Sequence, residues 1–331
     1  MRSVPAGSFE RLTELAALWS AWKDYRRGKT RRPRVAAFDL DADRHLIALR
    51  RDLRRGAYRP GGYALSVIRD PKTRLIAAQP VRDCVVQQAL LDDIGETYER
   101  GFIDHAYACS TGRGPLRAVL TYLRWTRRYR FRLALDVRRY FLSVHRPTLC
   151  RLIARRLRDA QTRRLVEMLI EAGGEVYRRP LAVAVLGLEA EPLPPDAGLP
   201  IGSYLSQWSG SLYLDGLDHF VKRQFKIRGY LRFMDDLTLF ADDAGRLEEA
   251  RGAVGEWLAR ERRLELNPRR GTVVPAAQPS VYLGYRVSRG GILPSRKMKR
   301  RMKKRVRAVR HQGRGKLERS LRSYRGLMTF G

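Results

Sequence analysis

Cysteine and histidine are scarce in this sequence, which has three cysteines and five histidines among its 331 residues. Cys84, Cys109 and Cys150 lie far apart, and there is no C-x-x-C pair or cluster of histidines. An odd number of widely spaced cysteines argues against a disulfide framework, and the missing cluster argues against a zinc site. The pattern is typical of a protein in the reducing cytosol.

Long apolar runs are also missing. No stretch approaches the roughly 20 apolar residues that span a bilayer, and residues 1–19 lack the apolar core of a signal peptide. We therefore expect a cytoplasmic protein that is not exported and has no membrane partner.

Acidic residues are few relative to basic ones. The sequence has 34 Asp+Glu against 67 Lys+Arg, a formal charge of +33, and 44% of its residues are hydrophobic. The apolar content supports a core, whereas the charge exceeds what solubility requires and indicates a polyanionic partner. Nucleic acid is the first candidate, and an anionic membrane surface is the second.

Apolar periodicity predicts alternating helices and strands. We expect helices at about 9–27, 43–55, 80–98, 146–172, 203–222 and 244–263, and strands in 63–78 (a hairpin with Asp70-Pro71 in its turn), 131–137, 230–240 (a hairpin), TVVP (272–275) and VYLGYRV (281–287). Residues 190–202, rich in Pro and Gly, are expected to be an irregular loop. Such an order implies an α+β or α/β sheet domain. From 287 to 331 there are 16 basic residues against one acid, Glu318, which predicts a separate basic helical unit.

Three carboxylates stand out at strand ends. Asp235 and Asp236 lie at the tip of the predicted hairpin 230–240, and Asp136 lies near the end of strand 131–137. Paired aspartates are also ordinary turn residues, and two other pairs occur, at 92–93 and at 242–243, the second where a helix N-cap is expected. If the two strands are neighbours in one sheet, the three acids converge on an oxygen-rich site for two Mg²⁺ ions.

The order of five motifs resembles the palm motifs of reverse transcriptases: DVRRYFLSVH (136–145), PIGSYLSQ (200–207), FMDD (233–236), LNPRRGT (266–272) and YLGY (282–285). HAYACSTGRG (105–114), and IGxxxSQ at 201–207 where most of these enzymes have QGxxxSP, resemble more narrowly the reverse transcriptases of diversity-generating retroelements. The resemblance covers about residues 63–330. It implies an α+β right-hand polymerase with fingers, palm and thumb, whose antiparallel palm sheet packs on helices and whose thumb is short and helical. The implied divisions are a helical extension (1–60), fingers (61–130), palm (131–286, with an insertion at about 146–200) and a basic helical thumb (287–331).

By this resemblance Asp136 and Asp235 are ligands of two Mg²⁺ ions, with Mn²⁺ as an alternative in vitro. Asp236 is then close to the primer end, and the carbonyl of Val137 is a further metal contact. For Asp136 the alternative is a polar residue that merely ends a strand.

The nucleotide site follows from the same resemblance. Arg74 matches the triphosphate-binding arginine, and Arg69 or Lys72 is a candidate for a second contact, although each is equally a solvated surface charge. A guanidinium suits phosphate because it donates two parallel hydrogen bonds. Phe141 stands five residues after Asp136, where an aromatic closes off the sugar 2′ position and favours deoxynucleotides; the alternative is an ordinary core residue.

Ile201 replaces the glutamine of conventional reverse transcriptases, whose amide hydrogen bonds an aliphatic side chain cannot make. In the resembled group this change accompanies error-prone copying at template adenines. Gln207 completes the motif, with helix capping and packing as the alternative.

The template and primer contacts are expected in a loop, a turn and a helix. Arg113 lies in the glycine-containing loop, residues 282–285 would form the primer grip or else a tightly turned core strand, and ten of the fifteen residues 296–310 are basic. The candidate contacts are Arg113, Tyr282, Leu283, Gly284, Tyr285, Arg296, Lys297, Lys299, Arg300, Lys303 and Lys304. Phosphate contacts of this kind add affinity without reading sequence.

Three features depart from the family pattern. Ser110 stands where an arginine is common, Phe233 replaces a Tyr or Ala, and the short basic segment suggests a small thumb helped by a partner.

The expected function is that of an RNA-directed DNA polymerase that copies a retroelement template RNA into adenine-mutagenised cDNA, the step behind mutagenic retrohoming. The resemblance implies a bacterial or phage-encoded chain whose partners are a template non-coding RNA, the cDNA and a small, basic, oligomeric accessory protein. Two alternatives stay open, an antiphage-defence reverse transcriptase and a non-catalytic RNA-binding scaffold.

Overall fold

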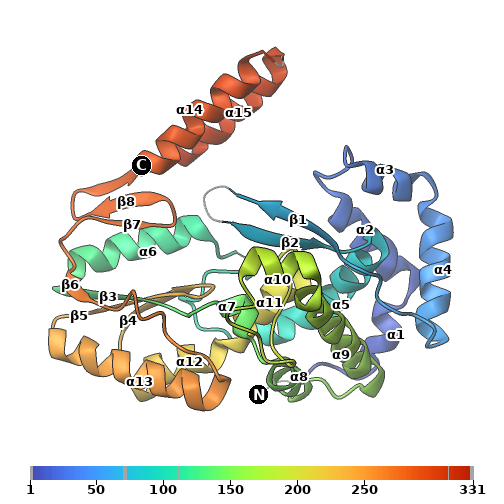
Figure 1. Cartoon of the computed structure of the whole chain (residues 1–331), viewed down its shortest axis with the longest axis horizontal. Coiled ribbons are helices and arrows are strands. Elements are labelled where there is room, and N and C mark those ends of the chain that lie inside the picture. Colours follow the sequence, from blue (N-terminus) through green and yellow to red (C-terminus); the bar gives the residue numbers. More distant parts are fainter. Residues whose placement is uncertain (1–2, 70–72, 111, 312, 329–331) are drawn as a thin grey trace. The chain divides into compact units, whose positions relative to one another are not determined.

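The chain divides into two compact units in the computed structural model, which describes residues 3–69, 73–110, 112–311 and 313–328 (Figure 1). The first unit comprises residues 1–103, 137–217 and 257–265, and the second comprises 104–136, 218–256 and 266–331. Two helices, α12 (Asp215–His219) and α13 (Ala244–Arg262), have residues in both units.

The first unit consists of helices and one hairpin. Its helices are α1 (Ser8–Leu12), α2 (Leu15–Arg26), α3 (Pro33–Leu40), α4 (Ala42–Arg54), α5 (Val81–Glu99), α7 (Tyr140–Ser143), α8 (Arg146–Ala154), α9 (Ala160–Gly174), the 3-10 turn η1 (Glu175–Arg178), α10 (Pro180–Leu186) and α11 (Tyr204–Tyr213). Helix α4 illustrates why they form, because Leu46, Leu49 and Leu53 recur on one face and are buried.

The hairpin of the first unit pairs β1 (Ala64–Ile68) with β2 (Arg74–Ala78) in antiparallel register. Leu75 and Ala77 of β2 are buried with Tyr177 and Ala182, so the hairpin packs on η1 and α10. The turn predicted at Asp70-Pro71 lies outside the described residues. The predicted hairpin is confirmed for its two strands.

The second unit is built on a four-stranded antiparallel sheet in the order β4-β5-β3-β6. Its strands are β3 (Phe131–Asp136), β4 (Gly229–Phe233), β5 (Asp236–Ala241) and β6 (Val273–Pro275). Helix α6 (Pro115–Arg128) packs on one face through a core that includes Tyr122, Leu231 and Phe240, and residues 244–256 of α13 run along the other face (Figure 1). The antiparallel sheet packed on helices confirms the predicted fold class.

A second sheet, β7-β8-β9, leads into a pair of long helices. Its strands are β7 (Ser280–Tyr282), β8 (Tyr285–Ser288) and β9 (Gly291–Pro294), and the helices are α14 (Arg296–Arg310) and α15 (Arg314–Met328), which lie side by side (Figure 1). Ser295 caps α14 by accepting a hydrogen bond from the Met298 N–H, and its own N–H donates to the Gly284 carbonyl at 3.0 Å. The root of α14 is therefore bonded to the β7–β8 turn.

The predicted single helix over 203–222 is wrong. Helix α11 ends at Tyr213, and the short α12 and the π-helix η2 (Phe220–Gln224) follow. The Arg262 Nε donates to the Tyr213 carbonyl at 2.6 Å. In a continuing helix that carbonyl would accept a hydrogen bond from a backbone N–H of the next turn. A Cβ on Gly216 would come within 2.7 Å of the Arg262 guanidinium, so the bend also needs glycine there.

Several elements were not predicted, among them α3, α7, α10 and β9, and one composition boundary is not a structural one. The basic segment that begins at residue 287 still contains strand β9, and its first helix starts at Arg296. The helices expected in 9–27, 43–55, 80–98, 146–172 and 244–263 are present, with breaks after Leu12 and after Ala154. No helix among the described residues is long and apolar enough to cross a membrane.

Candidate active site

Two of the three predicted carboxylates face each other across the sheet of the second unit. Asp136 is the last residue of β3 and Asp236 the first of β5, and the two are direct partners in the antiparallel register. Asp235 occupies the two-residue turn that joins β4 to β5, together with Met234. Because directly opposed residues have Cβ atoms about 5 Å apart, the condition under which the acids converge, that β3 and β5 are neighbours, is fulfilled.

Two residues of the LNPRRGT motif bind these acids, and sequence reasoning assigned neither of them a role. The Asn267 side chain donates to Asp136 Oδ2 at 2.8 Å, and its backbone N–H donates to the Asp136 carbonyl at 2.7 Å. Arg270 pairs with Asp236 Oδ1 at 3.1 Å. The motif itself was the available signal, because its Asn and Arg stand just before the predicted strand 272–275 and both side chains donate hydrogen bonds to carboxylates.

Asp235 differs from the other two acids because its charge is poorly compensated. Burial, followed by the negative charges of Asp236 and Asp136, raises its pKa to about 6. Like charges held together in this way are unfavourable in the bare protein. The arrangement is one that an added cation would stabilise.

The donor set is of the kind that Mg²⁺ and Mn²⁺ prefer, since the candidate ligands are carboxylate oxygens and one backbone carbonyl oxygen, that of Val137. In the described part of the chain, however, no group of three or more His, Cys, Asp or Glu side chains is arranged to hold an ion. Arg270 already neutralises Asp236, which leaves Asp136 and Asp235 as the ligands that fit a cation best.

The pair Asp242-Asp243 is structural. Asp243 accepts a hydrogen bond from the Gly245 N–H at 2.9 Å at the start of α13, and Asp242 accepts one from the Arg130 N–H. The predicted N-cap role is confirmed. The same dipeptide therefore serves as a helix cap here and as an acidic turn at Asp235.

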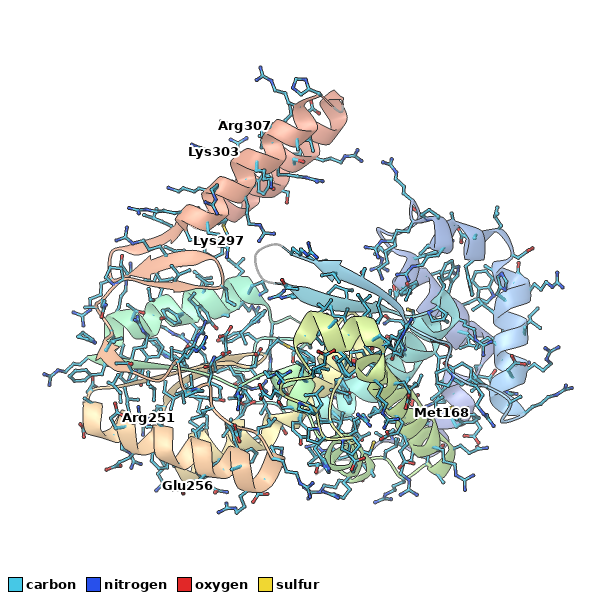
Figure 2. The ribbon with its side chains drawn as sticks, in the orientation of Figure 1. Met168, Arg251, Glu256, Lys297, Lys303 and Arg307 are labelled. Carbon is cyan, nitrogen blue, oxygen red and sulfur yellow. The ribbon has the colours of Figure 1, made fainter. Side chains whose placement is uncertain are left out.

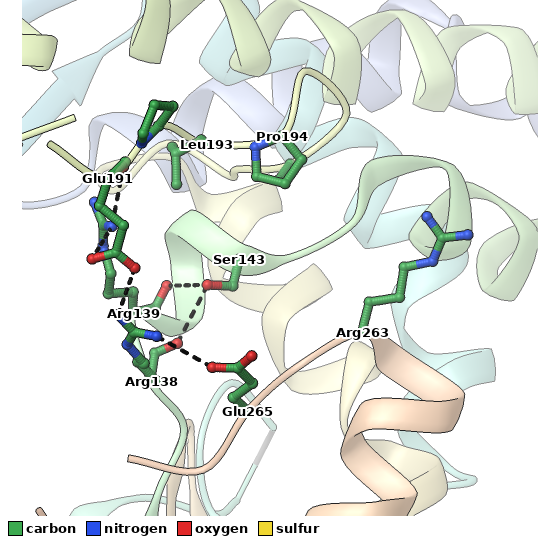
Figure 3. Close-up of a pocket in the computed structure, with 10 residues that line it drawn as sticks. Arg138, Arg139, Ser143, Glu191, Leu193, Pro194, Arg263 and Glu265 are labelled. Atoms are coloured by element: carbon green, nitrogen blue, oxygen red, sulfur yellow. Dashed lines mark hydrogen bonds and ion pairs between the residues drawn. The ribbon is translucent and has the colours of Figure 1, made fainter. Parts of the chain in front are cut away.

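The segment after Asp136 belongs to the first unit and is tied down by ion pairs (Figure 3). Arg138 pairs with Glu191 at 2.6 Å and with Glu265 at 3.2 Å, Arg139 pairs with Glu191 at 2.9 Å, and the Ser143 hydroxyl donates to the Arg139 carbonyl. These side chains line a pocket of about 190 Å³. They hold the chain between Val137, which is buried, and Phe141.

Phe141 is half-buried on the short helix α7, beside α11. A Cβ on Gly210 would stand 3.4 Å from the rings of Phe141 and Tyr140, and the Tyr140 hydroxyl donates to the Gly210 carbonyl. Gly210 thus gives the two rings room against α11. Both predicted roles of Phe141, gate and packing residue, are compatible with this position.

Ile201 is bonded through its backbone to the hairpin that carries Arg74. The Ala77 N–H of β2 donates to the Ile201 carbonyl at 2.8 Å, and a Cβ on Gly202 (φ +123°) would lie 2.7 Å from the Ala77 carbonyl. Only glycine tolerates both that φ and that approach. The IG dipeptide therefore fixes the start of α11 against β2.

A buried amide network continues this connection. Gln87 of α5 donates to the Gln79 side chain at 2.7 Å and accepts from the Ser203 hydroxyl at 2.9 Å. Ser203 also caps α11 by accepting from the Ser206 N–H. Helix capping, one of the alternatives for this motif, is thus performed by Ser203, whereas Gln207 is exposed.

The predicted triphosphate contacts lie on the surface of the same hairpin. Arg74 at the start of β2 and Arg69 just after β1 are exposed. Lys72 lies outside the described residues. Exposed guanidinium groups near a hairpin turn are available to an anionic ligand.

Residues 282–285 form a tight turn between β7 and β8. Leu283 and Gly284 have φ of +46° and +89°, and the Tyr282 ring stacks on Tyr122 at 4.4 Å between centroids. Tyr282 and Tyr285 are buried, and the Tyr282 hydroxyl has no hydrogen-bond partner among the described residues. Burial, with the nearby charge of Asp236, raises the Tyr282 pKa well above its usual value.

The ten basic residues of α14 are all exposed, including Lys297, Lys303 and Arg307, which Figure 2 labels along this helix. The predicted template and primer cations Arg296, Lys297, Lys299, Arg300, Lys303 and Lys304 are among them. Arg113 contacts Asp104 at 3.7 Å and the Ala106 carbonyl at 3.4 Å. The Ser110 hydroxyl is buried without a hydrogen-bond partner in the described part of the chain.

Comparison with protein families matches residues 69–287 to the family described as "Reverse transcriptase (RNA-dependent DNA polymerase)". The match covers the four-stranded sheet of the second unit and strand β2 of the first. The chain belongs to the reverse transcriptase family.

Comparison with curated proteins gives no match. Among solved structures, the chain is similar to a telomerase from Candida albicans, determined in complex with a fragment of telomeric RNA, with 10% identity and a TM-score of 0.45. The similarity covers 72% of this chain and 46% of that one, so this chain spans less than half of the telomerase.

Proposed function

We propose that the chain is an RNA-directed DNA polymerase that copies a retroelement template RNA into cDNA with frequent errors at template adenines. The observation that carries the polymerase proposal is the register of the sheet, in which Asp136 and Asp236 are opposed and Asp235 occupies the adjoining turn. Family membership supports the same reaction class. A non-catalytic RNA-binding scaffold has no use for three neighbouring carboxylates that repel one another.

Asp136 and Asp235, with the Val137 carbonyl, are the proposed ligands of two divalent cations. The chemistry that such ions supply when bound is activation of an attacking hydroxyl and stabilisation of a leaving pyrophosphate. Asn267 holds the Asp136 carboxylate in place, and Arg270 holds Asp236. Asp236 is then the residue closest to the primer end rather than a third ligand.

The proposed nucleotide site combines Arg74, Phe141 and Ile201. Arg74, supported by Arg69 or Lys72, donates hydrogen bonds to the triphosphate, and Phe141 excludes a 2′-hydroxyl. Ile201 contributes apolar contact to the nascent pair, and its place is set by the bond from its carbonyl to Ala77. Gln207 is exposed on the first turn of α11.

The proposed template and primer surface consists of Arg113, the turn 282–285 and the basic face of α14. The bond between Ser295 and Gly284 connects the last two. Contacts between α14 and phosphates carry no sequence information and weaken with salt. Selection of the template therefore falls to a structured RNA and to a small, basic, oligomeric accessory protein, as in the resembled group.

The experiment that tests the function is RNA-templated DNA synthesis by the chain, co-purified with its natural RNA and accessory protein, followed by sequencing of the cDNA. We expect errors concentrated at template adenines. A withheld hydrogen bond is worth about 0.5–1.5 kcal/mol, or roughly a factor of two to thirteen in discrimination. Ile201→Gln should accordingly lower the adenine error rate by about that factor and leave errors at the other bases unchanged.

Other outcomes lead to other conclusions. Synthesis of cDNA with few errors, or with errors spread evenly over the four bases, would replace the mutagenic role with an antiphage-defence one. Absence of any DNA product with the natural RNA would refute the polymerase itself.

A further inference from the structure

We infer that Arg232 is a positioning residue for the acidic turn, and that its guanidinium orients the peptide group preceding Asp235. Arg232 lies on β4, three residues before Asp235, and only 1% of its side chain is exposed. A cation buried this deeply is costly unless the fold uses all of its donors. The inference rests on the proposed polymerase function.

The first partner of Arg232 is a carboxylate that is buried completely. Arg232 Nε donates to Asp218 Oδ1 at 2.7 Å, and a terminal nitrogen donates to Asp218 Oδ2 at 2.6 Å. The Tyr230 hydroxyl, also on β4, donates to Asp218 Oδ1 at 2.6 Å. The two parallel bonds fix the plane of the guanidinium, as the bidentate geometry requires.

The other terminal nitrogen of Arg232 points to the turn. It donates to the Met234 carbonyl at 3.0 Å. That carbonyl belongs to the peptide group that joins Met234 to Asp235, so its direction determines how the Asp235 backbone leaves the turn. Asp218 holds the guanidinium of Arg232, and the guanidinium in turn fixes the orientation of the main chain at Asp235.

The turn needs such a fixed contact because its backbone is strained. Met234 has φ of +56°, a conformation that hairpin turns usually give to Gly, Asn or Asp. A residue keeps a strained backbone conformation only where several surrounding contacts hold it there. Here the Met234 carbonyl is held by Arg232, and the Met234 sulfur contacts the Cys109 sulfur at 3.8 Å.

The backbone of Arg232 is held as firmly as its side chain. Its N–H donates to the His105 carbonyl, and its carbonyl accepts from the Tyr107 N–H, both at 2.9 Å. Residues 105–107 thus lie along the outer edge of β4. Arg232 cannot shift along the strand to follow a displaced turn.

Arg232→Lys separates positioning from stability. A lysine ammonium keeps the charge beside Asp218 but cannot supply two parallel bonds to the carboxylate and a third bond to the Met234 carbonyl. Outer-shell partners of metal ligands typically change affinity or activity by about 10–100-fold. We expect kcat for DNA synthesis and the affinity of the bare protein for Mn²⁺, measured by electron paramagnetic resonance, to fall by about that range, with the KM for dNTP within about twofold.

Arg146→Lys is the matched control. Arg146 is almost as deeply buried, and it binds one carboxylate, that of the half-exposed Glu171, and two carbonyls, those of Pro195 and Ala197, within the first unit. The control should also lower the melting temperature, but it should leave kcat and Mn²⁺ affinity within about twofold of wild type. Parallel losses in the two variants, or wild-type kcat and Mn²⁺ affinity in Arg232→Lys, would overturn the inference.

A milder pair of variants covers the case in which Arg232→Lys does not fold. Tyr230→Phe removes one bond to Asp218 and keeps the ion pair, whereas Tyr213→Phe removes a buried hydroxyl bonded to the Arg262 carbonyl. We expect Tyr230→Phe alone to weaken Mn²⁺ binding, by about threefold, as the loss of one hydrogen bond implies, and equal effects of the two would contradict the inference. Because Mn²⁺ binding needs no polymerase activity, a wild type that makes no DNA would refute the proposed function while this comparison still decides the inference.

Discussion

Two hairpins of this chain carry the proposed site charges, of opposite sign, and are built in opposite ways. The β1–β2 hairpin of the first unit is two-stranded, is exposed along much of its length, and carries Arg69 and Arg74 near its turn. The β4–β5 hairpin of the second unit is enclosed in a four-stranded sheet, with most of its residues buried, and carries Asp235 and Asp236 at its turn. The β1–β2 hairpin is held mainly at its base, whereas the β4–β5 hairpin is held by its neighbours along its whole length.

The difference agrees with the role that we propose for each charge. A guanidinium that binds a mobile phosphate keeps its hydration until the anion arrives, so exposure suits it. Carboxylates that must share a cation need fixed separations despite their repulsion, and only a rigid framework maintains them. The acidic hairpin is therefore held in place by the sheet register, Asn267 and Arg232. The arginines of the basic hairpin are instead exposed to solvent.

The largest expected effect is at the acidic turn. Asp136→Asn and Asp235→Asn should each lower DNA synthesis by about 10³-fold, because each removes a charge worth several kcal/mol to a bound cation. Asp243→Asn is the matched control, since asparagine also caps a helix, and should keep wild-type activity. Rates measured on a primed RNA template decide the matter, and wild-type synthesis by either of the first two variants would contradict the assignment.

Arg74→Ala tests the basic hairpin. Loss of a hydrogen bond to a charged group costs about 1.5–3 kcal/mol, so we expect the KM for dNTP to rise by about 10–100-fold with an unchanged melting temperature, because Arg74 is exposed. Arg69→Ala should raise KM less. Equal effects of the two would mean that the hairpin acts only through its net charge.

Gln87→Met asks whether the base of the basic hairpin matters. The change removes the bonds to Gln79 and Ser203 and leaves their polar atoms buried, at a cost of about 1–3 kcal/mol in unfolding free energy. We expect a lower melting temperature and a KM for dNTP raised by a few fold, because the start of α11 loosens against β2. Gln88→Met, at the next residue, which bonds Asp92 near the surface, should change neither.

The smallest effect is a pH dependence along β4. Burial lowers the pKa of His105 to about 4, well below its usual 6.5. The neutral imidazole is therefore favoured in the fold, and the stability it contributes is complete above pH 6.5 and lost as the pH falls toward 4. His105→Gln should reduce the drop in melting temperature between pH 7.5 and pH 5, and an unchanged drop would show that other groups cause it.

The strands and the order of motifs could be predicted from the sequence because both are local. Alternating apolar residues marked β3, β4 and β5, and the acids at their ends marked the site. Their pairing could be stated only as a condition, because no local pattern tells which strands are neighbours. The register that opposes Asp136 to Asp236 is a property of the folded sheet.

What could not be predicted depends on contacts between distant residues. The end of α11 is set by Arg262, 49 residues further on, and the buried pair Asp218–Arg232 looks in the sequence like two ordinary charges among many. Asn267 and Arg270 lay in a recognised motif but acquired partners only when β3 and β5 were placed. The helix α3 begins at Pro33, a typical first helical residue, and was hidden by the basic run around it.

Helix α14 has a linear charge density close to that of nucleic acid. Its fifteen residues extend about 22 Å and carry ten cations and no acid, or about one positive charge every 2.2 Å, against one negative charge every ~1.7 Å along duplex DNA. The cations of α14 repel one another and attract anions from solution. A duplex that binds to α14 displaces these anions and also loses some of its own bound cations. Folding of α14 and binding of a duplex to it are consequently linked. Salt weakens the binding of the duplex, but it stabilises α14 in the absence of a duplex because it screens the repulsion between the cations.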